Sequence, residues 1–251
     1  MDRITSRKNP NIVRIRRLSS DRDFRYSCGE YVCEGMTLLE EARCANAEIT
    51  MIIWNGDYEI PRCDVKEQYE VPPELYDYVS PLKNSPGPLF SVKMPVHDTQ
   101  ESIASSIILE NVQDPGNIGT VIRTANAFDI GSVVLTGSCA DQYNIKAVRA
   151  SMGAVFRQRT DRVELGSLRD FAGFNSLRLC AAELSDEAED IRVIDCSRCA
   201  FAVGNEGNGL SRELMDICDI KVIIPMSPHA ESLNAAIAAG ILMWEVRRQE
   251  K

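Results

Sequence analysis

The sequence predicts an α/β protein with two domains, of which the second is built on an open, mostly parallel sheet. From Ser105 onward, short apolar runs of strand length alternate with longer segments of helical periodicity, which is typical of strands joined by crossover helices. A proline-rich stretch, Ser80 to Asp98, precedes this pattern and has the composition of a linker. We therefore expect a smaller α/β domain over residues 1–82, a linker over 83–104 and a larger domain over 105–251.

The expected first domain combines helices with one clear strand. Ile12, Ile15 and Leu18 recur at helical spacing and predict a helix over 11–18. An apolar face predicts a second helix over 34–45, and the proline pair 72–73 begins a third. The apolar run 49–54 is a strand candidate, and 89–92 is a possible strand inside the linker.

The expected second domain alternates strands and helices in order. Apolar and β-branched runs predict strands over 107–109, 133–135, 155–158, 177–181, 200–203 and 221–224. Helical spacing predicts helices over 118–128, 145–152 and 168–171, one from Ser211, and one from 231 to about 247.

The composition is that of a globular protein in a reducing compartment. Of the 251 residues 44% are hydrophobic and 26% charged, and no apolar run approaches the length of a membrane span. The first residues are polar and basic, unlike a signal peptide. The nine cysteines are mostly isolated and fit free thiols. Cys196 and Cys199 have CxxC spacing but no second pair, so buried or incidental thiols are favoured over zinc. We expect a cytoplasmic protein without a metal.

The net charge of −9 disfavours binding to phosphate, but the distribution of charge matters more than its sum. Basic residues are concentrated near the N-terminus, at Arg3, Arg7, Lys8, Arg14, Arg16, Arg17, Arg22 and Arg25. A second basic cluster comprises Lys146, Arg149, Arg157 and Arg159. Local basic patches on an acidic body are compatible with nucleic acid, although composition alone favours an ordinary solvated face.

Three segments each lead from an apolar strand through a polar, Gly- or Pro-rich loop into a helix. Such loops can converge on one ligand at the carboxyl edge of a parallel sheet. In the first, 111–129, the run Asp-Pro-Gly-Asn-Ile-Gly supplies a tight turn, and Asn117 is a good N-cap residue. Arg123 follows on the same helix. A capping Asn and a surface Arg are the simpler interpretation of this segment taken alone.

The second segment, 201–211, contains Gly-Asn-Glu-Gly-Asn-Gly and presents Glu206 at a bend. Its spacing matches neither the Walker A loop nor the dinucleotide fingerprint, and an ordinary turn would also explain it. The third, 223–245, opens Ile-Ile-Pro-Met and continues through Glu231-Ser-Leu-Asn into a helix of small residues, 235–240. Small residues allow close packing, either on a neighbouring helix or on a second subunit.

Taken together, the order, spacing and residue types of these segments resemble the three signature motifs of the SpoU (TrmH-like) family of RNA ribose 2'-O-methyltransferases in the SPOUT superfamily. The resemblance covers residues 105–247 and extends more loosely to 4–10 and 30–36. It implies a deep trefoil knot in the C-terminal domain, S-adenosyl-L-methionine as cofactor, and an N-terminal domain that recruits RNA. Ribosomal RNA is favoured over transfer RNA because that separate domain is present. It also implies a homodimer through the knot domain, with the last helix in the interface, and neither membrane nor metal.

The resemblance assigns roles to residues that match the motifs. The cofactor-binding residues it implies are Gly204, Ile224, Met226, Ser232, Leu233 and Asn234. The catalytic residues it implies are Arg123, Asn117, Glu206, Ser232 and Asn234. The RNA-binding residues expected from the basic clusters are Arg7, Lys8, Arg14, Arg16, Arg17 and Arg149.

Arg123 and the loop 227–230 each differ from a simple interpretation of the family pattern. A guanidinium stays protonated, so we expect Arg123 to orient the ribose and a phosphate and to stabilise the developing alkoxide, rather than to act as the base. Residues 227–230 read Ser-Pro-His-Ala where relatives often carry glycines, and we interpret His229 as a loop residue.

Two other functions compete with this one. A non-catalytic RNA-binding or ribosome-assembly protein on the same fold would fail to bind S-adenosylmethionine. A nucleotide-dependent oxidoreductase would need a phosphate-binding glycine loop after the first strand of the second domain, and the loop there has the wrong spacing.

Overall fold

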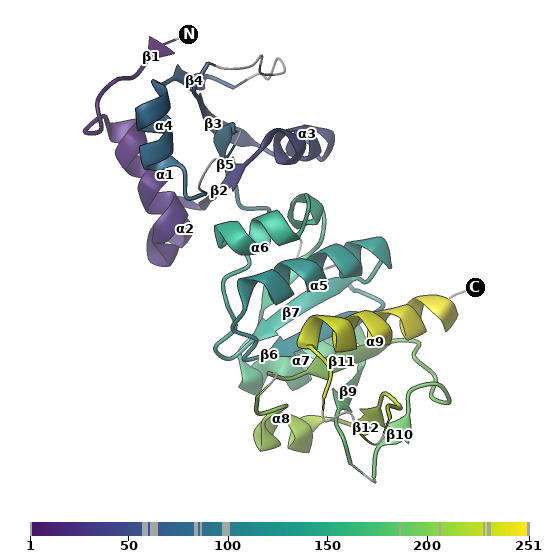
Figure 1. The fold of residues 1–251 in the computed structure, drawn as a ribbon. Coiled ribbons are helices and arrows are strands. Elements are labelled where there is room, and N and C mark those ends of the chain that lie inside the picture. The colour runs from purple at the N-terminus through teal and green to yellow at the C-terminus, as the bar shows by residue number, and fades with distance from the viewer. Residues whose placement is uncertain are drawn as a thin grey trace. The chain divides into compact units, whose positions relative to one another are not determined.

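The computed structural model describes residues 2–56, 60, 65–82, 85, 87–96, 101–185, 187–205, 207–227, 229 and 232–249. The chain forms two compact units (Figure 1). The first contains residues 1–96 together with 143–157, and the second contains 97–142 together with 158–251.

The first unit is built on a mixed five-stranded sheet of order β1-β4-β3-β5-β2. Its strands are β1 (Asp2–Arg3), β2 (Glu30–Glu34), β3 (Ile49–Trp54), β4 (Glu67–Glu70) and β5 (Leu89–Lys93). Its helices are α1 (Pro10–Ser20), α2 (Arg22–Cys28), α3 (Met36–Cys44), α4 (Pro73–Val79), α6 (Ile145–Ala150) and the 3₁₀ turn η1 (Ala154–Phe156). Strand β5 pairs antiparallel with β2 and β3, whereas β4 pairs parallel with β1 and β3.

Helices cover both faces of this sheet. On one face α1 and α4 bury their apolar stripes, such as Ile12 and Leu75, against Met51 and Leu89. On the other face α3 packs with Leu39 against Phe90. The spacing of apolar residues in α1, α3 and α4 therefore predicts their buried sides, as amphipathic helices require.

The segment 143–157 belongs to the first unit although the chain on both sides of it belongs to the second. Tyr143, Val148 and Val155 join the core that contains α3. The ring of Tyr143 lies with its centroid 4.6 Å from that of the fully buried Tyr31.

The expected linker 83–104 is wrong over part of its length. Residues 89–93 form β5, which lies between β3 and β2 and is buried. The prolines that suggested a linker flank this strand instead of interrupting it, and a proline outside a strand removes none of its ladder hydrogen bonds.

The second unit is built on a seven-stranded sheet of order β10-β12-β9-β11-β6-β7-β8, in which every pair is parallel. Its strands are β6 (Ser106–Glu110), β7 (Ser132–Thr136), β8 (Thr160–Arg162), β9 (Arg178–Ala182), β10 (Glu189–Asp190), β11 (Cys199–Val203) and β12 (Ile220–Ile223). Its helices are α5 (Pro115–Ala127), α7 (Leu168–Asn175), α8 (Arg212–Ile217), α9 (Ala235–Gln249) and the 3₁₀ turn η2 (Leu165–Ser167).

Helices cover this sheet as the strand and helix alternation predicts. Helices α7 and α8 pack with Leu168 and Leu214 on the face that carries Ile108 and Ala202. Helices α5 and α9 lie side by side over the sheet (Figure 1). In the part of the chain that the structure describes, no helix is long and apolar enough to cross a membrane.

Three expected elements differ from the structure. The strand expected at 155–158 is wrong, because Ala154–Phe156 is a 3₁₀ turn and the strand is Thr160–Arg162. The apolar side chains that suggested a strand instead enter the core of the first unit. Helix α3 begins at Met36, after Gly35, and the last helix begins at Ala235 and not at 231.

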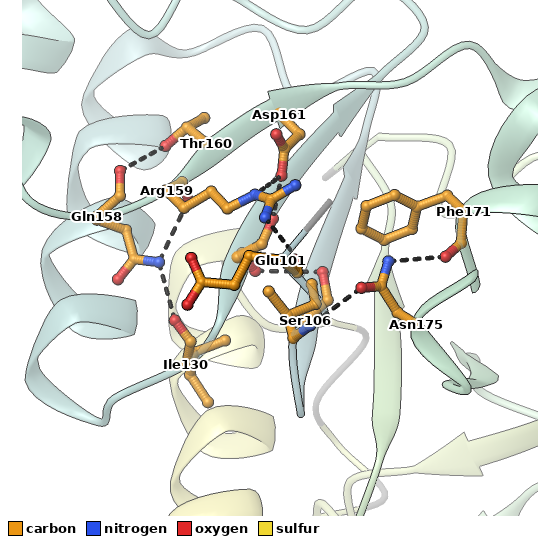
Figure 2. Close-up of polar contacts among 11 residues, drawn as sticks. Glu101, Ser106, Ile130, Gln158, Arg159, Thr160, Asp161, Phe171 and Asn175 are labelled. Carbon is orange, nitrogen blue, oxygen red and sulfur yellow. Dashed lines mark hydrogen bonds and ion pairs between the residues drawn. The ribbon is translucent and has the colours of Figure 1, made fainter. Parts of the chain in front are cut away.

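A polar network fastens the amino edge of the second sheet (Figure 2). Arg159 bonds to Asp161 at 2.8 Å and to the carbonyl of Glu101 at 3.1 Å. The side chain of Asn175 accepts from the backbone N–H of Ile103 at 3.0 Å and donates to the carbonyl of Phe171 at 2.8 Å. These bonds hold the segment before β6 and lie at the strand starts, so the opposite edge is left for the three loops.

Candidate active site

The three loops singled out in the sequence follow β6, β11 and β12, and all seven strands are parallel. Their loops therefore emerge at one edge of the sheet. From β6 the chain adds β7 and β8 on one side, whereas β9 to β12 lie on the other side. The order reverses between β6 and β11, which is where ligands bind in open α/β sheets.

The first loop begins α5 with a cap that differs from the one expected. Asp114, not Asn117, is the N-cap: its carboxylate accepts from the N–H of Gly116 at 2.7 Å, and Pro115 takes the first helical position. Asp is as good a cap as Asn, and proline is favoured at the position after it. Asn117 therefore lies in the first turn of α5 and is not its N-cap.

Asn117 instead connects the first segment to the third. The side-chain amide of Asn234 donates to Oδ1 of Asn117 at 3.2 Å. The Oδ1 atom of Asn234 accepts from the N–H groups of Ala236 and Ile237, at 3.0 and 3.3 Å, and so caps the start of α9. Two residues expected in the same site are thus in direct contact, although they are far apart in the sequence.

Arg123 lies on α5 and is exposed. Its guanidinium makes no hydrogen bond or ion pair with any residue that the structure describes. Glu206, the other charged residue expected at the site, lies outside the described residues, as does Glu231 at the start of the third motif. The catalytic roles of Arg123 and Glu206 stay predictions.

The Gly-rich loop after β11 closes on itself. The N–H of Asn205 donates to the carbonyl of Gly209 at 3.2 Å, and the N–H of Gly209 donates back to the carbonyl of Asn205 at 2.8 Å. A Cβ on Gly204 would lie 2.1 Å from the carbonyl carbon of Gly209. Glycine is therefore required at 204 by close approach of backbone to backbone.

A cavity of about 510 Å³ lies against this loop. It is within the range of pockets that hold small organic ligands. The predicted residues that line it are Gly204, Ile224, Met226, Ser232 and Leu233. Asn234 does not line the cavity and lies beside Asn117, so its expected contact with the cofactor stays a prediction.

Sequence reasoning missed the residues that fix the loops. Glu110 is buried and accepts from both the N–H and the hydroxyl of Ser211, and Asn205 donates to the carbonyl of Asn111. It also missed Ala182 and the residues after it, which line the cavity beyond β9. A charged residue at the end of an otherwise apolar strand was the available signal for Glu110.

The basic residues of the first unit fall into two groups. Arg14 is engaged within the fold: its Nη2 lies 2.5 Å from Oε2 of the buried Glu30, and its Nη1 lies 3.5 Å from Glu67. Arg7 and Arg16 place their guanidinium carbons 4.4 and 4.1 Å from the ring centroid of Tyr78. Arg7 and Arg16 form the second group: their side chains remain exposed, and stacking on Tyr78 holds them in place.

The remaining expected RNA contacts are also placed. Arg17 stacks on Phe24 at 3.9 Å and pairs with Asp21 at 3.3 Å. Lys8 and Arg149 are exposed.

The second basic cluster is divided between the two units, and two of its arginines form ion pairs. Arg157 pairs with Glu41 at 2.6 Å in the first unit, and Arg159 pairs with Asp161 at 2.8 Å in the second. These ion pairs neutralise both arginines.

The CxxC cysteines are buried thiols. Gln249 accepts from the N–H of Cys196 at 2.9 Å and donates to its sulfur at 3.3 Å, which holds the end of α9. Among the described residues no three His, Cys, Asp or Glu side chains are grouped so that they could hold a metal ion. His229 is exposed and lies in the loop before α9.

Comparison with known proteins agrees with this geometry. The model of the SpoU rRNA Methylase family matches residues 104–244. The 23S rRNA (guanosine(2553)-2'-O)-methyltransferase RlmP of Bacillus subtilis is 29% identical over 250 residues, which are 98% of this chain and 100% of that protein. The 23S rRNA (uridine(2479)-2'-O)-methyltransferase of Streptomyces viridochromogenes is 29% identical over 267 residues, 98% of this chain and 92% of that protein.

A solved structure extends the match to three dimensions. The crystal structure of the SpoU methyltransferase AviRb from Streptomyces viridochromogenes, in complex with the cofactor AdoMet, has a TM-score of 0.86 at 27% identity and covers 96% of this chain and 98% of that chain. The family model spans more than half of the 251 residues and includes all three loops, of which those after β11 and β12 line the cavity. The chain belongs to the SpoU rRNA methylase family.

Proposed function

We propose that this protein transfers a methyl group from S-adenosylmethionine to a ribose 2'-hydroxyl of ribosomal RNA. The observation that carries the proposal is the cavity formed by the loops after β11 and β12, whose lining residue Leu233 precedes Asn234, the partner of Asn117 on α5. The full-length relatives named as 23S rRNA 2'-O-methyltransferases support both the reaction and the substrate class.

The residues around the cavity fit the cofactor. Adenine has two apolar faces and a polar edge, and Ile224, Met226 and Leu233 supply apolar surface while Gly204 and Ser232 supply backbone and hydroxyl groups. The required glycine at 204 keeps the backbone uncovered where a ligand would approach. When bound, S-adenosylmethionine would supply an activated methyl group on a sulfonium.

Arg123 is the residue that we expect to act on the ribose. It is exposed and makes no bond with the described residues, so its five N–H donors are available to a phosphate and to the oxygen that becomes negative. A guanidinium does not lose its proton near neutral pH, which makes Arg123 an electrostatic stabiliser. Asn117, held by Asn234, presents a further polar group beside the same loop. We expect Glu206 and Ser232 to complete the site.

The test is methyl transfer from labelled S-adenosylmethionine to total RNA from a strain that lacks the gene. We expect label on a ribose 2'-oxygen of ribosomal RNA, and a loss of about 100-fold or more in Arg123→Ala, as for removal of one transition-state donor. Arg212→Ala, which removes another exposed arginine of the second unit, is the matched control and should retain activity. No transfer to RNA, together with failure to bind S-adenosylmethionine, would instead support a non-catalytic RNA-binding protein.

The first unit is the proposed RNA-recruiting domain. Arg7 and Arg16 stack on the two-faced ring of Tyr78, and Arg17 stacks on Phe24. Stacking fixes the planes of these guanidinium groups while their N–H edges can still reach phosphate. Together with the exposed Lys8 and Arg149 they are the residues that we assign to RNA binding, whereas Arg14 serves the ion pair with Glu30.

We further propose that the protein is a cytoplasmic homodimer through α9. The small residues Ala235, Ala236 and Ala239 are buried within the second unit, so they serve packing inside the subunit. The outer side of α9 instead exposes Ile237 and Trp244, which are 55% and 50% exposed. Exposed apolar residues repeated on one helix are typical of an interface.

Sedimentation velocity tests the dimer. Trp244→Glu should convert the protein to a monomer, because it places a charge in the buried centre of the proposed interface. Phe174→Glu changes an equally exposed aromatic residue on α7 and should leave a dimer. A wild-type monomer at micromolar concentration would contradict this proposal.

A further inference from the structure

The Gly-rich loop leaves the sheet immediately after its last backbone pairing. Strands β6 and β11 are paired up to Leu109 and Val203. Beyond that point no ladder fixes the distance between the loop and β6. Two side-chain contacts span this gap, one at each end of the loop.

The first contact is made by Glu110, the last residue of β6, whose side chain is buried. Its two carboxylate oxygens accept from the N–H and the hydroxyl of Ser211, at 2.7 and 2.6 Å. The same hydroxyl accepts from the N–H of Leu214 at 3.1 Å and so caps α8. Because Met215 of α8 lines the cavity, Glu110 holds one wall of it in place.

The second contact is made by Asn205. Its Oδ1 accepts from the N–H of Gly207 at 2.8 Å, which shapes the loop itself. Its Nδ2 donates to the carbonyl of Asn111 at 3.1 Å, which joins this loop to the loop that leads into α5. Asn111 has a positive φ of 56° and is anchored in turn by the N–H of Ser138 at 2.8 Å. Asn tolerates this left-handed conformation better than most residues.

We propose that Glu110 and Asn205 are positioning residues for methyl transfer. Glu110 sets the wall of the cofactor cavity and therefore cofactor affinity. Asn205 keeps the Gly-rich loop in register with the loop that begins α5, and therefore sets the distance between the cofactor and Arg123. This inference rests on the proposed function, in which the cavity holds S-adenosylmethionine and Arg123 acts on the ribose.

The test of Glu110 measures the dissociation constant of S-adenosylmethionine by titration calorimetry. Glu110→Ala should weaken binding by about tenfold or more, since it removes two bonds to a charged acceptor. Glu110→Gln keeps an acceptor for the N–H and a donor for the hydroxyl, so it should restore binding to within about threefold. The control is Glu34→Ala: Glu34 is also buried, and it accepts from Tyr76 and Ser80 at 3.0 and 2.7 Å in the first unit.

The test of Asn205 measures single-turnover methyl transfer at saturating cofactor and RNA. Asn205→Asp keeps an oxygen for Gly207 but can no longer donate to Asn111, so the rate should fall by about tenfold while cofactor affinity stays within about threefold. Asn175→Asp is the matched control, because Asn175 also accepts from one backbone N–H and donates to one carbonyl, at the opposite edge of the sheet (Figure 2). It should lower the melting temperature at least as much and leave the rate unchanged.

Each result decides the inference. Wild-type binding in Glu110→Ala, equal losses in Glu110→Gln and Glu110→Ala, or equal rate losses in Asn205→Asp and Asn175→Asp would overturn it. The last result would mean that the contact serves stability alone. Failure of the proposed function is a separate observation, because wild-type protein would then transfer no methyl group.

Discussion

Gly204 offers the sharpest test of the cavity. An alanine Cβ there would lie 2.1, 2.2 and 2.3 Å from the carbonyl carbon and oxygen of Gly209 and the nitrogen of Leu210. All three are backbone atoms, so no side chain can move aside. The loop must open and lose both hydrogen bonds between Asn205 and Gly209.

The cost follows from these contacts. Overpacking costs about 1–3 kcal/mol, and two lost hydrogen bonds add about 1–3 kcal/mol. In the free protein the loop can open, which relieves most of the strain. Because the cofactor requires the closed loop, most of the cost is then subtracted from the free energy of cofactor binding. Since about 1.4 kcal/mol is tenfold in affinity, Gly204→Ala should weaken S-adenosylmethionine binding more than tenfold. Its melting temperature should fall by only a few degrees.

Titration calorimetry beside thermal unfolding separates the two effects. Gly207→Ala is the matched control in the same loop, because its Cβ would meet only the side-chain oxygen of Asn205, at 3.3 Å. We expect it to bind cofactor within about threefold of wild type. Wild-type affinity in Gly204→Ala, or an equal loss in Gly207→Ala, would refute the steric reasoning.

Three further predictions concern the first unit. The buried hydroxyl of Tyr31 has no hydrogen-bond partner among the described residues, so Tyr31→Phe should raise the free energy of unfolding by about 1 kcal/mol, measured in urea. A fragment of residues 1–96 lacks Tyr143, Val148 and Val155 and so leaves part of its core uncovered. It should bind a hydrophobic dye, and its urea midpoint of unfolding should be lower than that of the full-length protein. The N–H of Phe24 and the Arg17 guanidinium lower the pKa of Asp21 below its ordinary 3.8, so the stability from this cap is present above that pH and is lost as the pH falls through the lowered pKa. Asp21→Asn should flatten that acid dependence of unfolding.

The residue periodicity predicts where most helices and strands of this fold lie, but it does not predict which elements pack against each other. The periodicities of 11–18 and 200–203 depend on neighbours along the chain, and both elements formed where they were expected. The segment 145–157 was correctly expected to contain a helix, but nothing in its own residues shows that it packs in the same unit as Tyr31, which is far away in the sequence. The strand β5 was expected as a possible strand over 89–92, but its place inside a sheet was not, because its burial comes from β2 and β3.

The part of the site that was predictable is the part built from loops after parallel strands, because such loops emerge at the same edge of the sheet. Gly204, Ile224 and Leu233 line one cavity because their strands end at the same edge. The partners of Glu110 and Asn205 lie in other loops, and no spacing in a single sequence reveals such a pair. The knot expected from the resemblance depends on the path of residues 204–234, several of which lie outside the described residues, and it stays a prediction.

The last prediction concerns which arginines attract RNA to a protein with a net negative charge. A net charge of −9 opposes binding, so the attraction must come from arginines that no acidic side chain neutralises. Arg16 stacks on Tyr78 and meets this condition, whereas Arg14 lies 2.5 Å from the buried Glu30 and does not. In binding isotherms over a salt series, Arg16→Ala should reduce the slope of log affinity against log salt by about one.

The charge of Arg14 alone would suggest that Arg14→Ala weakens RNA binding, but we expect it to affect stability instead. It should lower the free energy of unfolding by about 2 kcal/mol, because Glu30 loses one of its charged partners, and it should leave the salt slope unchanged. Equal slopes for Arg16→Ala and wild type, or a reduced slope for Arg14→Ala, would contradict the division of these arginines. The division matters for specificity: if stacked arginines are the only strong phosphate donors on an acidic body, we expect RNA to be held mainly where those donors are presented.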